Sequence, residues 1–392
     1  MQQTLKRFFH HESASGILLI IAMIMALIAA NTPLHALYTQ LLATPVIVAI
    51  GNFSIAKPLL LWINDGLMAL FFLLIGLELK REILIGHLNQ ASKIMLPACA
   101  ALGGMVVPAL IYVFINRDNP LALQGWAIPT ATDIAFALGI LSLLGSRIPT
   151  SLKIFLVSLA IFDDVGAIII IALFYTANLS MAALTGAAIG LIMLWWMNRK
   201  GIVTISAYLL VGLIVWVSLL KSGVHATLAG VAIAMFIPLQ GKDSEGVLQH
   251  PLQKLEKDLH TPINFVVLPL FAFANAGLSL LGLSLNDLFG GIPLGILMGL
   301  FLGKQIGVML FTWVAIKLRI GKLPDDISYS QLYGVAILCG VGFTMSLFIA
   351  SLAFEHVASD QLLNDRLGVL AGSVVSAIVG YCWLAFIAKP KT

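Results

Sequence analysis

The chain has 392 residues, of which 60% are hydrophobic and 10% are charged, and its mean hydropathy is +1.02. A soluble domain usually carries about 25% charged residues, so this chain lacks the polar groups needed to cover a globular surface. The net charge of +4 does not suggest nucleic-acid binding, because the basic residues are scattered through loops. The composition therefore predicts an all-α polytopic membrane protein.

Twelve apolar stretches are candidate transmembrane helices, because a spanning helix needs about 20 mostly apolar residues. The first follows Lys6 and Arg7 but ends without a clear small-x-small cleavage signal, so it is predicted to be a membrane span and not a signal peptide. No soluble domain is expected, and residues 1–392 are predicted to form one transmembrane domain. The candidate spans cover residues 15–31, 59–79, 94–114, 122–144, 150–175, 181–197, 203–219, 223–238, 262–282, 291–316, 332–354 and 367–388.

The distribution of basic residues predicts the orientation of the chain. An even number of spans places both termini on one side, and cytoplasmic loops are enriched in Lys and Arg. With the N-terminus inside, the inner segments hold 17 Lys and Arg residues and the outer loops hold 4. Lys304, the remaining basic residue, falls inside a span. Both termini are therefore expected in the cytoplasm.

Two loops have recognisable patterns. The outer segment 46–56, "VIVAIGNFSIA", has two β-branched runs around Gly51-Asn52, and a two-residue Gly-x turn between such runs predicts a β-hairpin. The inner segment 241–262, "GKDSEGVLQHPLQKLEKDLHTP", is the longest polar stretch. Its second half has apolar residues at helical spacing, which predicts a short amphipathic helix leading into the next span.

Ionisable residues inside the spans are the main functional signal. Such groups are rare in membranes and by default mark a path for ions or protons. The alternative is a purely structural role, in which a carboxylate and a lysine form an ion pair that only holds helices together. Glu78 and Glu82 lie nearby, at the inner end of the second span. The residues well inside spans are Asp65, Asp133, Asp163, Asp164 and Lys304.

The adjacent carboxylates of Asp163 and Asp164 lie in "SLAIFDDVGAIIIIALFY". Successive residues of a helix point about 100° apart, so the two need not share one task. One can face an ion while the other pairs with Lys304. Burial, like charges and nearby cations all change how readily a carboxylate takes up a proton. A proton and a small metal cation can then compete for the same oxygens, and this competition suffices to couple two opposing fluxes.

Two spans are interrupted at matching positions. In the fourth span, "WAIPTATDIAFALG", Pro129 precedes Asp133 by four residues, and the Thr130 and Thr132 hydroxyls can serve freed backbone groups or an ion. A half-helix beginning near Thr132 would direct its positive end at Asp133. The eleventh span is interrupted by glycines before Thr344. Each is the middle span of a three-span group, which predicts an inverted-repeat transporter with two crossed discontinuous helices. An ordinary proline kink with capping threonines is the alternative.

His225, in "KSGVHATLAG", lies near the outer end of the eighth span. A polar packing histidine is the expected reading, and a response to pH is the alternative. The cysteines Cys99, Cys339 and Cys382 all lie in apolar runs and suit neither a disulfide framework nor a metal site.

Taken together, these residues resemble the NhaA-type bacterial sodium/proton antiporters, a family known for inverted repeats with interrupted spans. The resemblance covers nearly the whole chain. It implies export of Na+ or Li+ in exchange for a larger number of protons, electrogenic and active at alkaline pH, without a cofactor and without enzymatic chemistry. It also implies a bacterial inner-membrane protein that forms a homodimer through the 46–56 hairpin. The matching motifs are "LLWINDGLMALFFLLIGLELKRE", "GWAIPTATDIAFALG", "LKIFLVSLAIFDDVGAIIIIALFY", "LKSGVHATLAGV", "LPLFAFANAG", "GKQIGV" and "CGVGFTMSLFIASLAF".

By matching position, the resemblance assigns roles to single residues. Asp163 and Asp164 would bind the cation and protons, with Thr132 as a further ligand of Na+ or Li+. Asp133 and Lys304 would balance the charges of the broken helices. The other expected ion-site residues are Asp65 and Thr344, and the expected pH-response residues are Glu78, Glu82, Glu256, Lys257, His260 and His225.

One position departs from the family pattern. Lys257 stands where familiar members have a histidine, which puts the pH threshold in doubt but not the transport reaction. Other classes of membrane protein also bury aspartates. An intramembrane aspartyl protease would need a Gly-x-Gly-Asp string, and an isoprenoid-processing enzyme would need Asp-Asp-x-x-Asp; neither string occurs. A cation channel lined by acidic residues is the remaining alternative.

Overall fold

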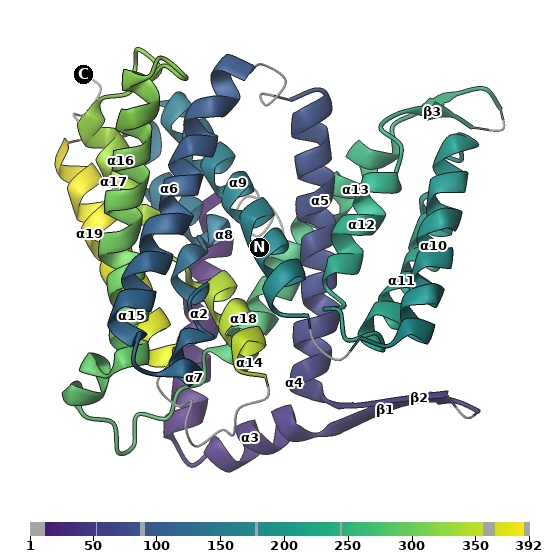
Figure 1. The fold of residues 1–392 in the computed structure, drawn as a ribbon, viewed down its shortest axis with the longest axis horizontal. Helices are drawn as coiled ribbons and strands as arrows, with labels where there is room; N and C mark the ends of the chain where they lie inside the picture. The colour runs from purple at the N-terminus through teal and green to yellow at the C-terminus, as the bar shows by residue number, and fades with distance from the viewer. Residues whose placement is uncertain are drawn as a thin grey trace, which may run out of the picture. The chain divides into compact units, whose positions relative to one another are not determined.

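The computed structural model describes the chain in six stretches and is helical there, apart from two short two-stranded sheets (Figure 1). Both chain ends lie outside the described residues, so the cytoplasmic location of the termini stays a prediction. The described stretches are residues 12–51, 53–86, 91–176, 179–243, 245–355 and 365–387. The chain divides into a first unit, residues 1–35, 90–167 and 275–392, and a second unit, residues 36–89 and 168–274.

The first unit is built of helices, several of them broken. Its helices are α2 (Glu12–Asn31), α6 (Ala91–Asn116), α7 (Pro120–Leu123), α8 (Ile134–Leu143), most of α9 (Thr150–Phe174), α15 (Gly291–Met298), α16 (Lys304–Lys317), α17 (Tyr329–Leu338), α18 (Phe343–Ala353) and α19 (Asp365–Ile387). Its short turns are η3 (Ile128–Thr130), η4 (Gly145–Arg147), η6 (Leu285–Phe289) and the π-helical η7 (Gly299–Gly303).

Small residues decide how the helices of the first unit pack. Helices α6 and α16 lie side by side (Figure 1), and Gly103 and Gly307 face each other there so closely that a side chain on either would overlap the other's backbone. Helices α2 and α8 also approach closely at Gly16 and Gly139, where a side chain on either would lie 3.0–3.1 Å from the other's backbone. Close backbone approach through small residues is the usual way in which membrane helices associate, since lipid provides no hydrophobic driving force between them.

The second unit combines helices with both sheets. Its elements are α3 (His35–Ala43), β1 (Pro45–Ile50), β2 (Phe53–Pro58), α4 (Leu59–Trp62), the π-helical η1 (Ile63–Leu67), α5 (Met68–Leu84), α10 (Met181–Arg199), α11 (Ile205–Leu220), α12 (Leu228–Phe236), β3 (Gly241–Lys242), β4 (Leu248–Gln249), α13 (Pro251–Pro262), the π-helical η5 (Ile263–Val267) and α14 (Leu268–Asn275). A hydrophobic cluster with members on α5, α10, α11, α12 and α13 forms the core of this unit.

The predicted turn at Gly51 joins two paired strands. β1 and β2 pair antiparallel from Pro45 opposite Pro58 to Ile50 opposite Phe53, and Gly51 has a positive φ of 58°, which glycine adopts without steric cost. The predicted amphipathic helix is α13, whose buried residues include Leu252 and Leu255. The small β3–β4 ladder before it was not predicted.

The number of helices able to cross a membrane is lower than the twelve predicted spans. Among the described residues, seven helices are long and apolar enough, or up to nine if each of two bent helix pairs counts as one span. The predicted spans 203–219 and 223–238 correspond to α11, with 16 residues, and α12, with 9 residues. Both are shorter than the about 20 residues that a straight span needs, so the count of twelve stays a prediction.

Two predicted spans differ clearly from the helices found. The helix within the predicted span 262–282 ends at Asn275, and side chains bind the backbone carbonyls beyond it. The Arg366 guanidinium donates to the Gly277 carbonyl at 2.7 Å, and the Asn31 amide donates to the Leu278 carbonyl at 2.7 Å. In the predicted span 223–238, the helix begins only at Leu228, after a stretch of turns.

Candidate ion-binding site

The first helix break separates α7 and η3 from α8. The two parts, Pro120–Thr130 and Ile134–Leu143, are bent by 44° relative to each other. Between them the chain is extended, and Asp133 is the N-cap of α8, accepting a hydrogen bond from the Phe136 N–H at 2.9 Å. The first N–H groups of a helix have no partner within the helix, so the carboxylate stabilises the new start. The segment is a true break, not the kink that a proline alone would produce.

The second break separates α17 from α18, again with a bend of 44°. Gly340 and Gly342 lie in it, and at Gly340 a side chain would overlap the Leu300 carbonyl oxygen of η7. Glycine is required here by close approach of two backbones. The Ser373 hydroxyl accepts a hydrogen bond from the Phe343 N–H at 3.1 Å, which satisfies one of the free N–H groups at the start of α18.

The two breaks are joined directly by hydrogen bonds. The Asp133 N–H donates to the Val341 carbonyl at 2.7 Å, and the Ser346 hydroxyl donates to the Ile128 carbonyl at 2.8 Å. The Asp133 carboxylate also accepts the Thr344 N–H at 3.0 Å and the Thr344 hydroxyl at 2.5 Å. One negative charge therefore lies at the N-termini of both α8 and α18, where helix dipoles favour an anion.

Lys304 provides the opposite charge. Its side chain is fully buried, and its ammonium donates to the Thr130 carbonyl at 2.6 Å and to Asp163 Oδ2 at 2.6 Å. The carbonyl belongs to the last residue of η3, the end at which a helical segment carries partial negative charge. Of the two adjacent aspartates, Asp163 is thus the one that pairs with Lys304. The backbone N–H of Lys304 bonds the Gly299 carbonyl, five residues back, and closes the π-helical turn.

The Asp163 carboxylate is divided between two environments. Its Oδ2 accepts the Lys304 ammonium and the Thr132 hydroxyl, the latter at 2.7 Å. The same hydroxyl lies 2.9 Å from the Cys339 carbonyl, and because it has one proton it can donate to only one of them at a time. Asp163 Oδ1 is buried and has no hydrogen-bond partner among the residues that the structure describes. Asp164, the next residue of α9, is also buried, with 2% of its surface exposed.

The first unit therefore brings together six of the predicted site residues. They are Thr132, Asp133, Asp163, Asp164, Lys304 and Thr344. Asp65 belongs to the second unit instead. It lies on η1, and its carboxylate forms an ion pair of 2.7 Å with Lys57 on β2. Lys57 therefore balances the charge of Asp65 at the base of the hairpin.

The predicted pH-response residues lie on the second unit, and helices α5 and α13 bring most of them together. The Arg81 guanidinium lies 2.9 Å from Glu256 and 2.7 Å from Glu82. This contact shows that the second and ninth predicted spans are neighbours at this end, which the sequence could not show. Glu78 is half-buried one turn before Glu82. His225 lies apart, in the turn before α12.

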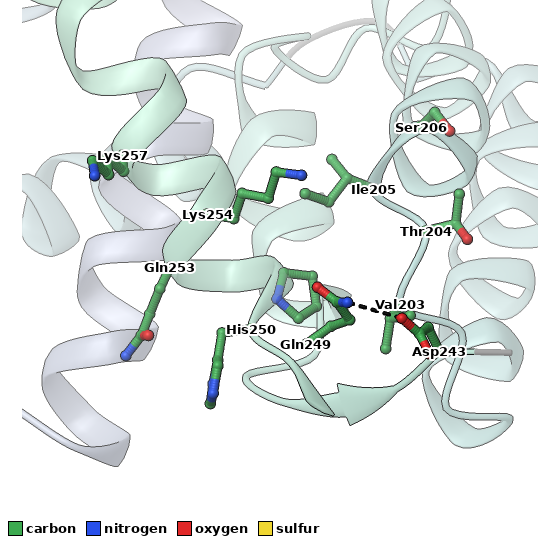
Figure 2. Close-up of a pocket in the computed structure, with 11 residues that line it drawn as sticks. Val203, Thr204, Ile205, Ser206, Asp243, Gln249, His250, Gln253, Lys254 and Lys257 are labelled. Carbon is green, nitrogen blue, oxygen red and sulfur yellow. Dashed lines mark hydrogen bonds between the residues drawn. The ribbon is translucent and has the colours of Figure 1, made fainter. Parts of the chain in front are cut away.

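Lys257 is exposed and lines two cavities of the second unit. The smaller, about 370 Å³, also includes Arg81, Glu256 and His260. The larger, about 680 Å³, lies between α13, the β3–β4 turn and the start of α11, and Figure 2 shows Lys254 extending across it toward Ile205. Asp243 lies at its edge. The Gln249 amide, at 2.8 Å, and two backbone N–H groups hold the pKa of the Asp243 carboxyl below its ordinary value.

Sequence reasoning missed several residues of the site. Ser346 and Ser373 bind backbone groups at the two breaks, and the Thr130 and Cys339 carbonyls accept hydrogen bonds from site residues. Hydroxyl side chains inside apolar spans were the available signal for the two serines. The carbonyls carry no sequence signal, because every residue has one.

Two broken helices that share one capping carboxylate, beside a buried Lys–Asp pair, are typical of the class of multi-pass secondary transporters. The family described as Na+/H+ antiporter 1 matches residues 6–384. The Na(+)/H(+) antiporter NhaA of Pseudomonas putida strain GB-1 is 58% identical over 392 residues, covering 100% of both chains. The Na(+)/H(+) antiporter NhaA of Psychrobacter arcticus is 56% identical, over 99% of this chain and 96% of the relative. The Na(+)/H(+) antiporter NhaA 3 of Saccharophagus degradans is also 56% identical, over 96% of both chains.

The chain therefore belongs to the NhaA Na+/H+ antiporter family. Members of this family are transporters and not enzymes, and they are multi-pass proteins of the bacterial inner membrane. The ions that such a protein moves are its cargo and not a resident cofactor.

Proposed function

We propose that this protein exports Na+ or Li+ in exchange for a larger number of protons, that the exchange is electrogenic, and that it is active at alkaline pH. Asp163, Asp164 and Thr132 bind the cation, and the same carboxylates bind the protons. The observation that carries this proposal is the Asp163 carboxylate. One of its oxygens is held by Lys304 and Thr132, while the other is buried and finds no hydrogen-bond partner within the described part of the chain.

An unpartnered carboxylate oxygen inside a membrane protein is costly unless a proton or a cation reaches it. Hard cations such as Na+ and Li+ prefer oxygen ligands, and carboxylates, hydroxyls and backbone carbonyls are the groups gathered here. Binding of the cation and of protons is mutually exclusive at these oxygens. A site that alternates between the two sides of the membrane then exchanges one for the other. The protons are carried by the Asp163–Asp164 pair, or by Asp164 together with Lys304.

The membrane arrangement is part of the same proposal. Twelve spans place both termini in the cytoplasm, spans 3–5 and 10–12 form inverted repeats, and the two broken helices cross. The hydrogen bond from Asp133 N–H to the Val341 carbonyl supports the crossing, because it joins the two breaks. The 46–56 hairpin lies on the extracytoplasmic side of the membrane and joins two protomers. Its backbone ladder and the Lys57–Asp65 ion pair support a rigid contact surface.

A cation channel is the second function that the composition allows. The family match does not favour it. A channel conducts without a proton gradient, whereas an antiporter shows saturable Na+ flux that stops when no proton can return.

The test is Na+-driven proton release from proteoliposomes that contain the purified protein. Wild type is expected to exchange, and Asp164→Asn is expected to lose exchange, because the amide cannot bind and release a proton in this range. Asp118→Asn is the matched control, since Asp118 is 93% exposed in the loop after α6. A membrane potential that follows Na+ addition supports electrogenic exchange. Wild-type rates in a folded Asp164→Asn protein contradict the site assignment.

A further inference from the structure

A pair of polar side chains next to Lys304 has no part in the site described so far. Gln305 follows Lys304 on α16 and is buried, with 7% of its surface exposed. Its amide nitrogen donates to the Phe301 carbonyl at 2.7 Å, and its amide oxygen accepts the Tyr333 hydroxyl of α17 at 2.8 Å. Both ends of the Gln305 amide are therefore used, one within η7 and α16 and the other across to α17.

The first of these contacts involves the π-helical turn that carries Lys304. In η7 the Lys304 N–H bonds the carbonyl five residues back, at Gly299, where an α-helix would use the carbonyl four residues back. Such a turn disturbs the regular ladder of backbone hydrogen bonds around it. The Gln305 amide donates to one carbonyl of this turn, that of Phe301. The side chain thus stabilises the irregular geometry that directs Lys304 into the site.

The position of η7 is constrained on its other sides by both helix breaks. A side chain at Gly299 would lie 2.6 Å from Pro129 Cβ, at the first break. The Leu300 carbonyl oxygen leaves no room for a side chain at Gly340, at the second break. A rotation of η7 therefore requires both breaks to adjust, and such a rotation also moves the Lys304 ammonium relative to Asp163.

Tyr333 is itself held in place. Its ring meets the Trp383 ring of α19 edge-on, with 5.1 Å between centroids. The Trp383 indole N–H donates to the Ser330 carbonyl at 2.9 Å, at the first turn of α17. Contacts between α17 and α19 therefore hold the Tyr333 hydroxyl in place where it donates to Gln305. Hydrogen bonds between membrane helices fix register in this way, because polar side chains in a span need partners.

We infer that Gln305 and Tyr333 are positioning residues for Lys304: their hydrogen bond holds η7 in the rotation that pairs the ammonium with Asp163 and the Thr130 carbonyl. This inference rests on the proposed Na+/H+ exchange at Asp163 and Asp164. Because Lys304 and Na+ compete for the Asp163 carboxylate, loosening Lys304 makes the carboxylate more available to Na+. A variant that merely damages the site would bind Na+ less tightly, so the two effects have opposite signs.

The experiment compares Tyr333→Phe and Gln305→Leu with wild type in proteoliposomes at one alkaline pH. Tyr381→Phe is the matched control, since Tyr381 lies on α19 and is 39% exposed. The apparent KM for Na+ is expected to fall by about threefold in Tyr333→Phe, the size expected for loss of one neutral hydrogen bond, at an unchanged maximal rate. Gln305→Leu removes both hydrogen bonds of the amide, so the fall is expected to be at least as large there. A KM equal to that of the control, or higher than it, overturns the inference.

A second measurement tests whether the effect acts through Lys304. Na+ raises the Tm of a protein that binds it, and this shift does not require transport. Tyr333→Phe is expected to lower the half-saturating Na+ concentration of this shift in the wild-type background and to leave it unchanged in Lys304→Ala. An equal change in both backgrounds shows that Tyr333 does not act through Lys304. If wild type itself shows no Na+-driven proton release, the proposed function fails, while the Na+-induced Tm shifts still decide the positioning role.

Discussion

Asp133 and Thr344 lie 211 residues apart in the chain, and the Asp133 carboxylate accepts both the backbone N–H and the hydroxyl of Thr344. The other oxygen of this carboxylate accepts the Phe136 N–H of its own helix. A single side chain thereby caps two helices that begin in the interior of the protein. Because both helix N-termini carry partial positive charge, one anion between them lowers the cost of starting helices away from water.

This relationship predicts the effect of substitutions at the two residues. Asp133→Ala removes the cap of two helices and is expected to lower stability by about 1–2 kcal/mol for each helix end. Thr344→Val keeps the backbone contact and removes only the hydroxyl, so a smaller loss is expected, and Thr344→Ser should restore most of it. Thermal unfolding in detergent measures all three. Equal Tm values for Asp133→Ala and wild type would contradict the capping role.

Lys304→Ala is expected to lower thermal stability strongly. The ammonium is fully buried between Asp163 and the Thr130 carbonyl, and removal of one partner leaves a buried carboxylate uncompensated. Loss of one member of a buried ion pair typically costs about 3–5 kcal/mol. We also expect the pH profile of exchange to shift, because the Asp163 carboxylate then binds and releases protons without the neighbouring ammonium group. Lys322→Ala, an exposed lysine in the α16–α17 loop, is the control. An unchanged Tm and pH profile would speak against a functional pair.

Deletion of residues 46–56 is expected to weaken dimers without stopping transport. The segment contributes most of the β1–β2 ladder, whereas the proposed cation ligands all lie in the first unit. An exposed strand edge can pair with its own copy across a two-fold axis. Size-exclusion chromatography in mild detergent, at matched protein concentrations, measures the dimer fraction. A deletion variant that remains as dimeric as wild type would show that the main contact lies elsewhere.

Lys257→His is expected to shift the pH dependence of exchange toward higher pH. Lysine stays charged through the alkaline range, while a histidine loses its charge near neutral pH. A cation favours the deprotonated forms of nearby carboxylates, and Glu256 and Arg81 line the same cavity as Lys257. Proton release from vesicles, scanned in pH, gives the midpoint for each variant, and Lys242→His on β3 is the control. Superimposable curves would leave Lys257 without a role, and loss of the alkaline plateau would mean that it does more than regulate.

The β3–β4 turn is expected to be insensitive to pH in the range where the antiporter works. Hydrogen bonds from Gln249 and from the backbone lower the pKa of Asp243. A carboxyl group with a lowered pKa stabilises the fold above its unfolded value of about 3.9, and this contribution is lost as the pH falls through the folded value. Amide hydrogen exchange of residues 245–249 should thus show constant protection from neutral to alkaline pH and faster exchange in Asp243→Ala. Loss of protection on alkalinisation alone would contradict this assignment.

Local patterns in the sequence were enough to indicate the class of the protein and several residues of its candidate site. Hydropathy indicated a membrane protein, since a chain with so few charges cannot cover a soluble surface. The β-branched runs around Gly51 predicted the hairpin, and the spacing of Leu252 and Leu255 predicted α13. Charges inside apolar runs identified Asp163, Asp164 and Lys304, because the energetic cost of such residues is visible without knowing where they lie. These signals are local, and each depends on neighbours within a few residues.

Tertiary structure alone decided which groups meet. Asp133 caps a helix of the second break, and Lys304 reaches the Thr130 carbonyl. Both contacts join residues that lie 174 or more positions apart in the chain. The Gln305–Tyr333 bond beside Lys304 was invisible for the same reason, because it joins two helices across 28 positions of the chain. Backbone carbonyls and helix ends provide many of the partners here. Every residue carries those groups, so only packing selects the few that a buried charge can use.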